Sequence, residues 1–305
     1  MTAPFRPMLP TAVPAPPTAD GWVHESKLDG YRCLAQVKPS RARLWSRAGT
    51  EWTDRLPELA SLTPLGDVVL DGEVVVVTPD GRADFELLGA RIHGPRYGPS
   101  SQPVSFYVFD VLQFGDQDLR DKPWIARRQV LDDLDVAART EGAARPTIWV
   151  ADGAAMHEAS RAVQAEGTVS KRTSSAYRPG RSRQWLKAKH KVEQKLQVAG
   201  WRPSTPARPG GLILAEHGEP IGVGTLAMPE RQRVALIDLL QRYGRQHPTG
   251  VVSIPEDRIQ AIVHYTARTP THGHLREAFV VAVEPIGSDS YDGPSPRGPS
   301  YPPAS

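Results

Sequence analysis

The stretch from His24 to Arg32, HESKLDGYR, places Lys27 between two acids, beside a glycine and directly before an apolar segment. Asp-Gly is among the commonest turn dipeptides, so a surface turn explains this pattern. A lysine flanked by positioned charges can also be made a nucleophile. The local sequence alone favours the turn, so the rest of the chain has to decide whether Lys27 is a reactive group.

The length and composition indicate two domains and no membrane segment. A chain of 305 residues exceeds most single cores, and hydrophobic and charged fractions of 39% and 23% are ordinary for a globular protein. No apolar run approaches the roughly 20 residues of a membrane span. Prolines interrupt residues 1–17, where a signal peptide needs a continuous apolar segment. The single cysteine, Cys33, excludes an internal disulfide and fits a reducing cytoplasm.

Positive charge is concentrated in one part of the sequence. The net charge is only +3, with a sequence pI near 9.0. Ten lysines and arginines nevertheless stand between Gly167 and Arg202, with one acid, Glu193. Tyr177, Trp185 and Trp201 are interleaved with them. A basic stretch with aromatic residues suits a polyanion better than a merely solvated face does, so we expect it to form such a surface.

The first two-thirds of the chain mixes short strands with a few helices. Residues 1–20 are proline-rich and are expected to be extended. Neighbouring strands are predicted at 21–28, 31–37 and 42–47, and buried strands at 68–77 (VVLDGEVVVV) and 105–112 (SFYVFDVL). Helical spacing marks residues 54–62, and residues 121–139 are predicted to form a helix with Pro123 in its first turn.

The pattern changes after residue 190. Five short strands are predicted, at 195–203, 210–217, 220–227, 261–267 and 279–285, and a helix at 229–243 interrupts them. Five strands with one helix in the middle are typical of a small barrel of the oligonucleotide-binding (OB) type. Residues 287–305 are rich in Pro, Gly and Ser, so we expect a disordered tail.

Six polar clusters follow one another along the chain, and each has a simple structural explanation when taken alone. They are ESKLDGYR (25–32), WSRAG (45–49), LDGE (70–73), FYVFD (106–110), EGTVSK (166–171) and WLKAK (185–189). In this order they resemble the ATP-dependent DNA ligases, which belong to the covalent nucleotidyltransferases together with RNA ligases and mRNA capping enzymes. The resemblance covers roughly residues 5 to 285, and the K-x-D-G-x-R signature of Lys27 is its most specific part.

The resemblance implies an α+β fold. A nucleotidyltransferase (adenylation) domain of antiparallel sheets with helices would span residues 21–190, followed by an all-β OB-fold barrel at 191–286. Lys27 would attack ATP to form a lysyl-AMP, the AMP would pass to a 5′-phosphate at a break, and the 3′-hydroxyl would then seal the strand. Lys187 and Lys189, two apart on a strand, project from one face, where they can stabilise the phosphate and disfavour protonation of Lys27. Asp29 would hold the loop or accept a proton.

The resemblance also assigns roles to the other matching positions. Arg32 and Arg47 are expected to contact phosphate, which suits the planar fork of arginine. Phe109 is expected to stack on adenine, with Glu25 at the edge of the base. Glu73 would bind the ribose, and Glu73 and Glu166 are the expected carboxylates for a divalent metal, Mg²⁺ with Mn²⁺ as the alternative. Lys171 and Arg276 complete the predicted set of nucleotide-binding residues.

The implied substrate is nicked or broken double-stranded DNA. The domain order resembles the small bacterial two-domain ligases linked to DNA repair and recombination, so DNA end-binding repair proteins are expected as partners. We further expect a monomer in the bacterial cytosol or nucleoid, without a membrane partner.

Two alternatives to a DNA ligase stay open from the sequence. An RNA ligase or a GTP-using capping enzyme would share the lysine chemistry. A non-catalytic DNA-binding relative is the other, because the last motif of the family is incomplete. Arg276 is present, but no Lys or Arg follows it before Arg297, and Glu284 stands near an expected basic position.

Overall fold

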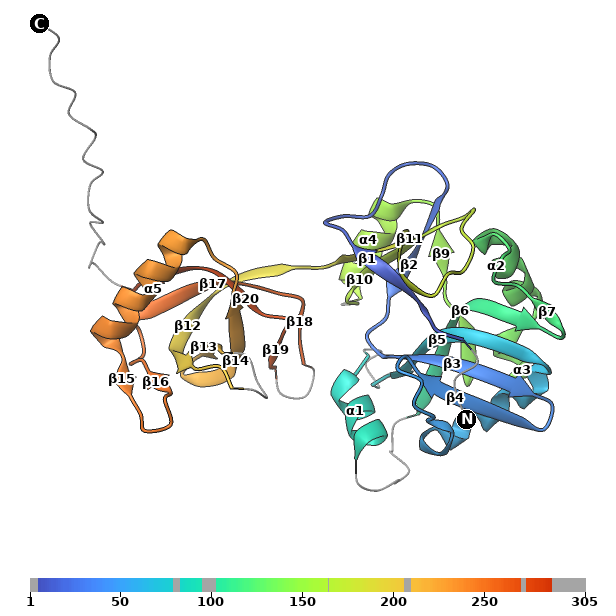
Figure 1. Ribbon diagram of the computed structural model, residues 1–305, viewed down its shortest axis with the longest axis horizontal. Coiled ribbons are helices and arrows are strands. Elements are labelled where there is room, and N and C mark those ends of the chain that lie inside the picture. Colours follow the sequence, from blue (N-terminus) through green and yellow to red (C-terminus); the bar gives the residue numbers. More distant parts are fainter. Residues whose placement is uncertain are drawn as a thin grey trace, which may run out of the picture. The chain divides into compact units, whose positions relative to one another are not determined.

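The computed structural model describes residues 5–78, 83–94, 103–163, 165–205, 210–269 and 273–286. The chain forms two compact units, the first consisting mainly of Met1–His190 and the second mainly of Lys191–Arg268 with the strands that follow (Figure 1). Within the described ranges, no helix is long and apolar enough to cross a membrane. The tail expected at residues 287–305 lies outside the described residues.

The first sheet of the first unit has the strand order β1-β11-β10-β2-β9. Its strands are β1 (Met8–Ala12), β11 (Gly180–Lys189), β10 (Gly167–Arg172), β2 (Trp22–Lys27) and β9 (Trp149–Val150). β1 runs parallel to β11, whereas β10 is antiparallel to both β11 and β2. The extended N-terminal segment therefore contains an edge strand of this sheet.

The second sheet has the strand order β4-β3-β5-β6-β7, and β8 pairs with β6 in parallel. Its strands are β4 (Arg41–Ser46), β3 (Tyr31–Lys38), β5 (Val68–Val76), β6 (Val104–Phe114), β7 (Gln117–Asp118) and β8 (Ala144–Pro146). β5 is the VVLDGE strand, and it is buried along nearly its whole length, as the apolar residues on both sides of its Asp-Gly-Glu predicted.

The first two predicted strands are not neighbours, which corrects the expectation from the sequence. β2 pairs with β10 and β9 in the first sheet, whereas β3 pairs with β4 and β5 in the second. Leu28 to Gly30 therefore carry the chain from one sheet to the other. Sequence alternation shows that each segment is extended but does not show which partner it pairs with.

The helices of the first unit are short. They are the 3₁₀ helices η1 (Thr53–Arg55) and η2 (Pro57–Leu65) and the α-helices α1 (Phe85–His93), α2 (Trp124–Asp133), α3 (Val136–Arg139) and α4 (Gly153–Ala162). The single helix predicted at 121–139 is wrong, because α2 ends at Asp133. Asp135 has a left-handed backbone with φ of 45°, which starts a new helix direction.

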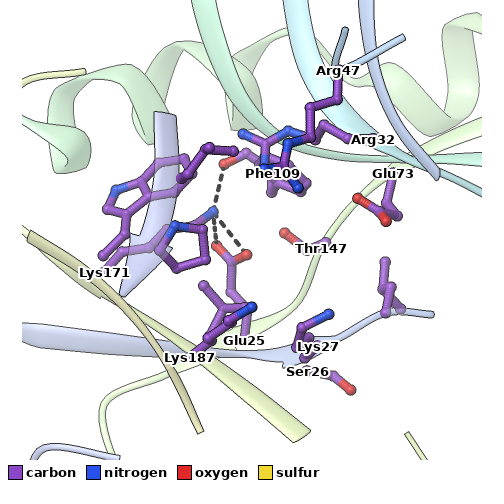
Figure 2. A pocket seen from close by; sticks show the side chains of 15 residues that line it. Glu25, Ser26, Lys27, Arg32, Arg47, Glu73, Phe109, Thr147, Lys171 and Lys187 are labelled. Carbon is purple, nitrogen blue, oxygen red and sulfur yellow. Dashed lines mark hydrogen bonds and ion pairs between the residues drawn. The ribbon is translucent and has the colours of Figure 1, made fainter. Parts of the chain in front are cut away.

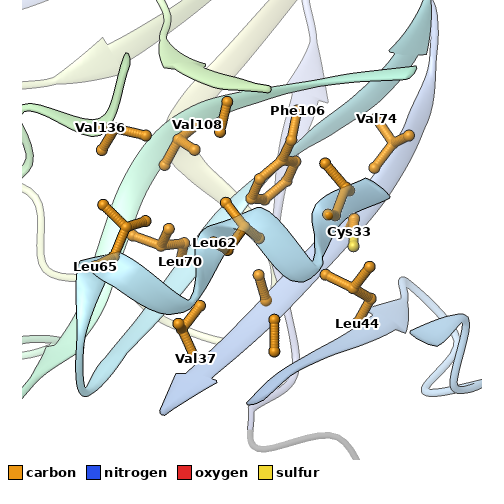
Figure 3. Packing of buried hydrophobic residues seen from close by; sticks show 14 of the residues in the cluster. Cys33, Val37, Leu44, Leu62, Leu65, Leu70, Val74, Phe106, Val108 and Val136 are labelled. Carbon is orange, nitrogen blue, oxygen red and sulfur yellow. The ribbon is translucent and has the colours of Figure 1, made fainter. Parts of the chain in front are cut away.

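The main core of the first unit lies on one face of the second sheet. Figure 3 shows Leu62 and Leu65 of η2 among Leu70 and Val108 of the sheet, and all four side chains are buried. Cys33 belongs to the same cluster, so it is a core residue, as its apolar strand indicated.

The second unit is a closed barrel with one helix. Its elements are β12 (Val192–Arg202), β13 (Gly211–Glu216), β14 (Glu219–Leu226), α5 (Glu230–Tyr243), β15 (Arg245–Gln246), β16 (Val252–Ser253), β17 (Ile259–Tyr265), β18 (Ala267–Arg268), β19 (Leu275–Arg276) and β20 (Phe279–Pro285). The order β13-β14-β20-β17-β12 closes because β12 also pairs with β13. Leu236 and Leu239 bury one side of α5 in the core of this unit. The architecture matches the predicted OB-type barrel.

Candidate active site

A pocket of the first unit gathers most of the predicted site residues, and both sheets contribute to it. Its lining includes Glu25, Lys27, Arg32, Arg47, Glu73, Phe109, Lys171 and Lys187. Figure 2 shows these side chains converging from strands of the first and the second sheet. Segments more than 150 residues apart in the sequence therefore meet in one pocket.

Glu166 holds Lys27 at this pocket. Its Oε2 accepts a hydrogen bond from Lys27 Nζ, and its Oε1 lies 2.5 Å from Lys189 Nζ. Burial alone would raise the pKa of Glu166, but Lys27 and Lys189 outweigh burial and keep the pKa below its ordinary value. The ion pair with Glu166 fixes the Lys27 amine. Because 19% of the Lys27 side chain remains exposed, a ligand can still reach it.

Gly30 explains the turn dipeptide beside this lysine. A Cβ at Gly30 would overlap the carbonyl oxygen of Val74 and lie 3.0 Å from Glu73 Cγ. A glycine lets β5 approach the chain at this point, where a larger residue would push it away. The Asp-Gly pair therefore lies in the crossover between the two sheets. Lys27, the last residue of β2, lines the pocket just before this crossover.

Lys187 reaches the pocket from β11, and β1 supports it. Ala12 pairs with Lys187, and the backbone N–H of Val13 donates to the Lys187 carbonyl at 3.0 Å. Lys189, two residues further along β11, contacts Glu166 instead of lining the pocket. Lys187 thus lines the pocket, whereas Lys189 pairs with the carboxylate that holds Lys27.

Arg32 is locked by an acid below the pocket. Its Nε donates to Asp71 Oδ1 at 2.5 Å, and its Nη2 donates to Asp71 Oδ2 at 2.6 Å and to the Met8 carbonyl at 3.1 Å. Tyr177 Oη donates to Asp71 Oδ2 at 2.6 Å and accepts from the Met8 N–H at 2.9 Å. Burial would lower the pKa of Arg32, but Asp71 raises it above its ordinary value, so Arg32 is a permanent cation.

Glu73 and Glu166 offer the oxygens that a divalent cation needs. Burial raises the pKa of Glu73 to about 7, against the effects of Arg32 and Lys27. A carboxylate in such surroundings is stabilised by an added cation, and Mg²⁺ prefers oxygen donors. In the described part of the chain no group of three or more His, Cys, Asp or Glu could hold a metal. A magnesium ion held by Glu73 and Glu166 would take its other ligands from water and phosphate, and it would have to compete with Lys27 and Lys189 for the Glu166 oxygens.

Four predicted residues are not part of the pocket lining. Two of them, Glu166 and Lys189, are linked to Lys27 as described above, and the others are Asp29 and Arg276. Asp29 is in the crossover between β2 and β3, next to Gly30. Arg276 is on β19 of the second unit, whereas the residues that line the pocket all belong to the first.

Several lining residues were not predicted from the sequence. They include Leu9 and Pro10 of β1, Thr147, and Trp185 of β11. Leu9, Pro10 and Thr147 belong to no motif, and only the parallel pairing of β1 with β11 brings the N-terminal segment to the pocket. For Leu9 and Pro10 the only signal in the sequence is the absence of charged residues from 8–13, and this signal is weak.

The basic stretch differs from the expected surface in its aromatic part. Tyr177 and Trp185 are buried in the cluster behind the pocket, and Trp201 is half-buried against the core of the barrel. Basic side chains are among the exposed ones, including Arg181, Arg183 and Lys191, together with Gln184, Val192 and Glu193. The stretch therefore offers charge to a polyanion, while its aromatic rings pack inside the two units.

The chain is similar to known DNA ligases. A family model described as an ATP dependent DNA ligase domain matches residues 7–189. The "Multifunctional non-homologous end joining protein LigD" of Pseudomonas aeruginosa is 34% identical over 215 residues, which cover 69% of this chain and 25% of that protein. The LigD protein of Mycobacterium tuberculosis is 34% identical over 287 residues, which cover 85% of this chain and 36% of that protein.

Two solved structures share the fold over most of the chain. The structure described as mycobacterial DNA ligase D complexed with ATP and MES is 29% identical, covers 92% of this chain and 94% of its own, and has a TM-score of 0.57. The ligase domain of M. tuberculosis LigD is 28% identical, covers 91% and 94%, and has the same TM-score of 0.57. The chain thus spans a quarter to about a third of the LigD proteins it matches, and nearly all of these two structures.

Proposed function

The chain belongs to the ATP-dependent DNA ligase family, and we propose that it seals breaks between a 5′-phosphate and a 3′-hydroxyl in double-stranded DNA. The observation that carries the proposal is the position of Lys27. Its amine lies in a pocket with two further lysines, two arginines and two buried aromatic rings, and Glu166 holds it in place. Such a site suits an amine that must attack a phosphorus atom within a polyanion.

In the first proposed step, Lys27 Nζ attacks the α-phosphorus of ATP. A nitrogen–phosphorus bond forms, the bond to the departing pyrophosphate breaks, and the amine proton leaves to solvent or to a neighbouring carboxylate. Lys187 and Arg47 are placed to stabilise the negative charge that develops on the phosphate. Arg276 is proposed to contact the departing pyrophosphate, and Glu73 and Glu166 to hold a Mg²⁺ ion, or Mn²⁺, which would neutralise phosphate charge.

In the two later steps the AMP group moves and leaves. A 5′-phosphate oxygen of the DNA attacks the phosphorus of the lysyl-AMP, which frees Lys27 and gives adenylated DNA. The 3′-hydroxyl then attacks the activated 5′-phosphate, AMP departs, and the strand is closed. Because the matched relatives are named for non-homologous end joining, we place the reaction in DNA repair, with DNA end-binding proteins as partners.

Sealing of defined substrates tests the proposal. We expect the chain to join a nicked DNA duplex with a 5′-phosphate when ATP and Mg²⁺ are present, and not to join the same duplex with a 5′-hydroxyl. A nicked duplex whose broken strand is RNA and a reaction with GTP in place of ATP are the comparison arms. Sealing confined to RNA, or supported only by GTP, would favour an RNA ligase or a capping-type enzyme instead.

A further inference from the structure

Lys171 lines the pocket but is almost fully buried, with no hydrogen-bond donor left for a ligand. Its side chain is 1% exposed, and its ammonium donates to Glu25 Oε1 at 2.9 Å, to Glu25 Oε2 at 2.8 Å and to the Phe109 carbonyl at 3.1 Å. Figure 2 shows these three interactions as dashed lines from one nitrogen. A lysine ammonium has three N–H donors. All three are therefore used within the protein.

Aromatic rings enclose the same ammonium. Lys171 Nζ lies 4.4 Å from the centre of the Phe109 ring, 4.7 Å from that of Trp185 and 5.9 Å from that of Trp124. Rings at such distances attract a cation through their faces, more strongly where water is excluded. The rings and the ion pair therefore hold the ammonium in one place.

The three interactions of Lys171 end on the two residues expected to recognise the base. Both carboxylate oxygens of Glu25 accept from Lys171, yet each retains a second lone pair that can accept from a ligand. Glu25 itself is 2% exposed and lines the pocket, so its carboxylate would be unpaired and buried without Lys171. The contact with the Phe109 carbonyl ties the aromatic ring to the same cation.

From this geometry we propose that Lys171 is a positioning residue that sets the choice of base. It fixes the Glu25 carboxylate so that its free lone pairs accept the 6-amino group of adenine, and it fixes Phe109 beside that group. Lys171 itself touches neither the base nor the phosphates. The inference rests on the proposed use of ATP, and it replaces the direct contact with nucleotide that the sequence suggested for this lysine.

The test compares ATP with purine riboside triphosphate, which lacks only the 6-amino group. The rate of covalent labelling is measured with each nucleotide, and the ratio of the two kcat/KM values is the readout. In the unchanged protein we expect a preference for ATP of at least about tenfold, the size of one hydrogen bond to a charged group. Lys171→Met should reduce this preference to less than about threefold, because Glu25 is then no longer held where it accepts from the amino group.

A second variant keeps the test decisive if Lys171→Met does not fold. Glu25→Gln with Lys171→Met removes both charges and leaves no unpaired ion in the pocket wall. Compared with Glu25→Gln alone, the double variant should change the nucleotide preference by less than about twofold, because Lys171 acts through Glu25. A loss that is equal for both nucleotides and appears on adding Lys171→Met would mean direct contact with phosphate, and it would overturn the proposal.

Arg127→Met is the matched control. Arg127 forms an equally buried ion pair with Asp110 at 2.7 Å and does not line the pocket. If this variant alters the preference for ATP as much as Lys171→Met does, the effect follows from loss of any buried ion pair, and the positioning role is wrong. If the unchanged protein takes up neither nucleotide, the proposed function itself fails, which is a separate result.

Discussion

At the scale of single residues, Arg32 shows how the pocket keeps a cation in one orientation. Its Nε and Nη2 donate hydrogen bonds to Asp71, and Nη2 also donates to the Met8 carbonyl. The Tyr177 hydroxyl completes this network, because it donates to Asp71 and accepts from the Met8 N–H. Among the described residues Nη1 has no hydrogen-bond partner, and Arg32 lines the pocket. We infer that one edge of the guanidinium serves the fold and that the other is available to a phosphate.

Phe109 gives a prediction at the same scale. Replacing Phe109 with Ala should weaken the use of ATP by about 1–3 kcal/mol if a base stacks on its ring. Arg32 Cζ and Lys171 Nζ each lie 4.4 Å from the centre of that ring, so a stacked base must share the ring with two cations. The measurement is the ATP concentration that gives half-maximal covalent labelling.

Phe109→Leu is the control, because leucine fills most of the space without offering an aromatic face. Labelling that needs more ATP in the Ala variant and, to a smaller degree, in the Leu variant supports stacking. An unchanged ATP requirement in both variants would mean that the ring serves only to hold the two cations.

Most single residues of the site could be predicted, because the motifs fix residue type and spacing together. Lys27, Glu73 and Lys187 belong to separate motifs, and all three line one pocket. Leu9 and Pro10 could not be predicted in the same way. They are apolar residues of a proline-rich segment, and only long-range strand pairing gives them their position.

At the scale of secondary structure, β2 brings Glu25 and Lys27 to the pocket and has a buried histidine next to Glu25. His24 is 1% exposed, and its Nδ1 lies 2.9 Å from Ser170 Oγ on β10. Burial lowers the pKa of His24, although Asp152 opposes the shift. The folded protein therefore holds this imidazole in its neutral form at a pH where the unfolded chain already begins to bind a proton.

This histidine makes stability depend on pH. The ordinary pKa of His is about 6.5, so below that pH the unfolded chain binds more protons at this position than the folded one. As the pH is lowered from about 7.5 to about 5.5, His24 should therefore lower the free energy of unfolding, and Glu73, whose pKa burial raises to about 7, should act in the opposite direction. Because His24→Asn removes only the first effect, any fall in the free energy of unfolding should be smaller in this variant, which keeps a polar group near Ser170. Urea unfolding at the two pH values measures the difference, and equal falls in both proteins would contradict the assignment.

The strands themselves followed from the sequence better than their partners did. Alternation and β-branched residues predicted both β2 and β3, but nothing local shows that the chain changes sheets at Gly30. The need for glycine there comes from the Val74 carbonyl, more than 40 residues away. Similarly, the helical pattern of hydrophobic residues continues past Asp133, where α2 ends. The left-handed backbone at Asp135 cannot be predicted from such a pattern.

At the scale of the whole molecule, the barrel of the second unit was predictable because each of its strands is bounded by turn signals. The exposed basic residues lie on both sides of the boundary between the two units in the sequence. Arg183 is on β11 of the first unit, and Lys191 is at the start of the second. How much of this charge meets DNA depends on the assembled complex, which no local pattern specifies.

DNA binding should accordingly depend strongly on salt. Each phosphate contact that is lost should flatten the slope of log K against log salt by about one, because fewer counterions are released. We expect this change for Arg183→Ala and for Lys191→Ala, and no change for the control Lys38→Ala, whose amine pairs with Asp67 in the second sheet. Equal slopes in all three variants would indicate that this face is solvated only.

The most direct test of the account is covalent labelling of the chain by ATP, followed by identification of the labelled residue. After incubation with ATP carrying a radioactive α-phosphate and Mg²⁺, we expect one adduct of AMP, located on Lys27 by digestion and mass spectrometry. Lys27→Ala should remove the label while the urea unfolding curve stays close to that of the unchanged protein, because the side chain lies at the pocket and not in a core. An adduct that persists in a folded Lys27→Ala chain, or that maps to another lysine, would contradict the account.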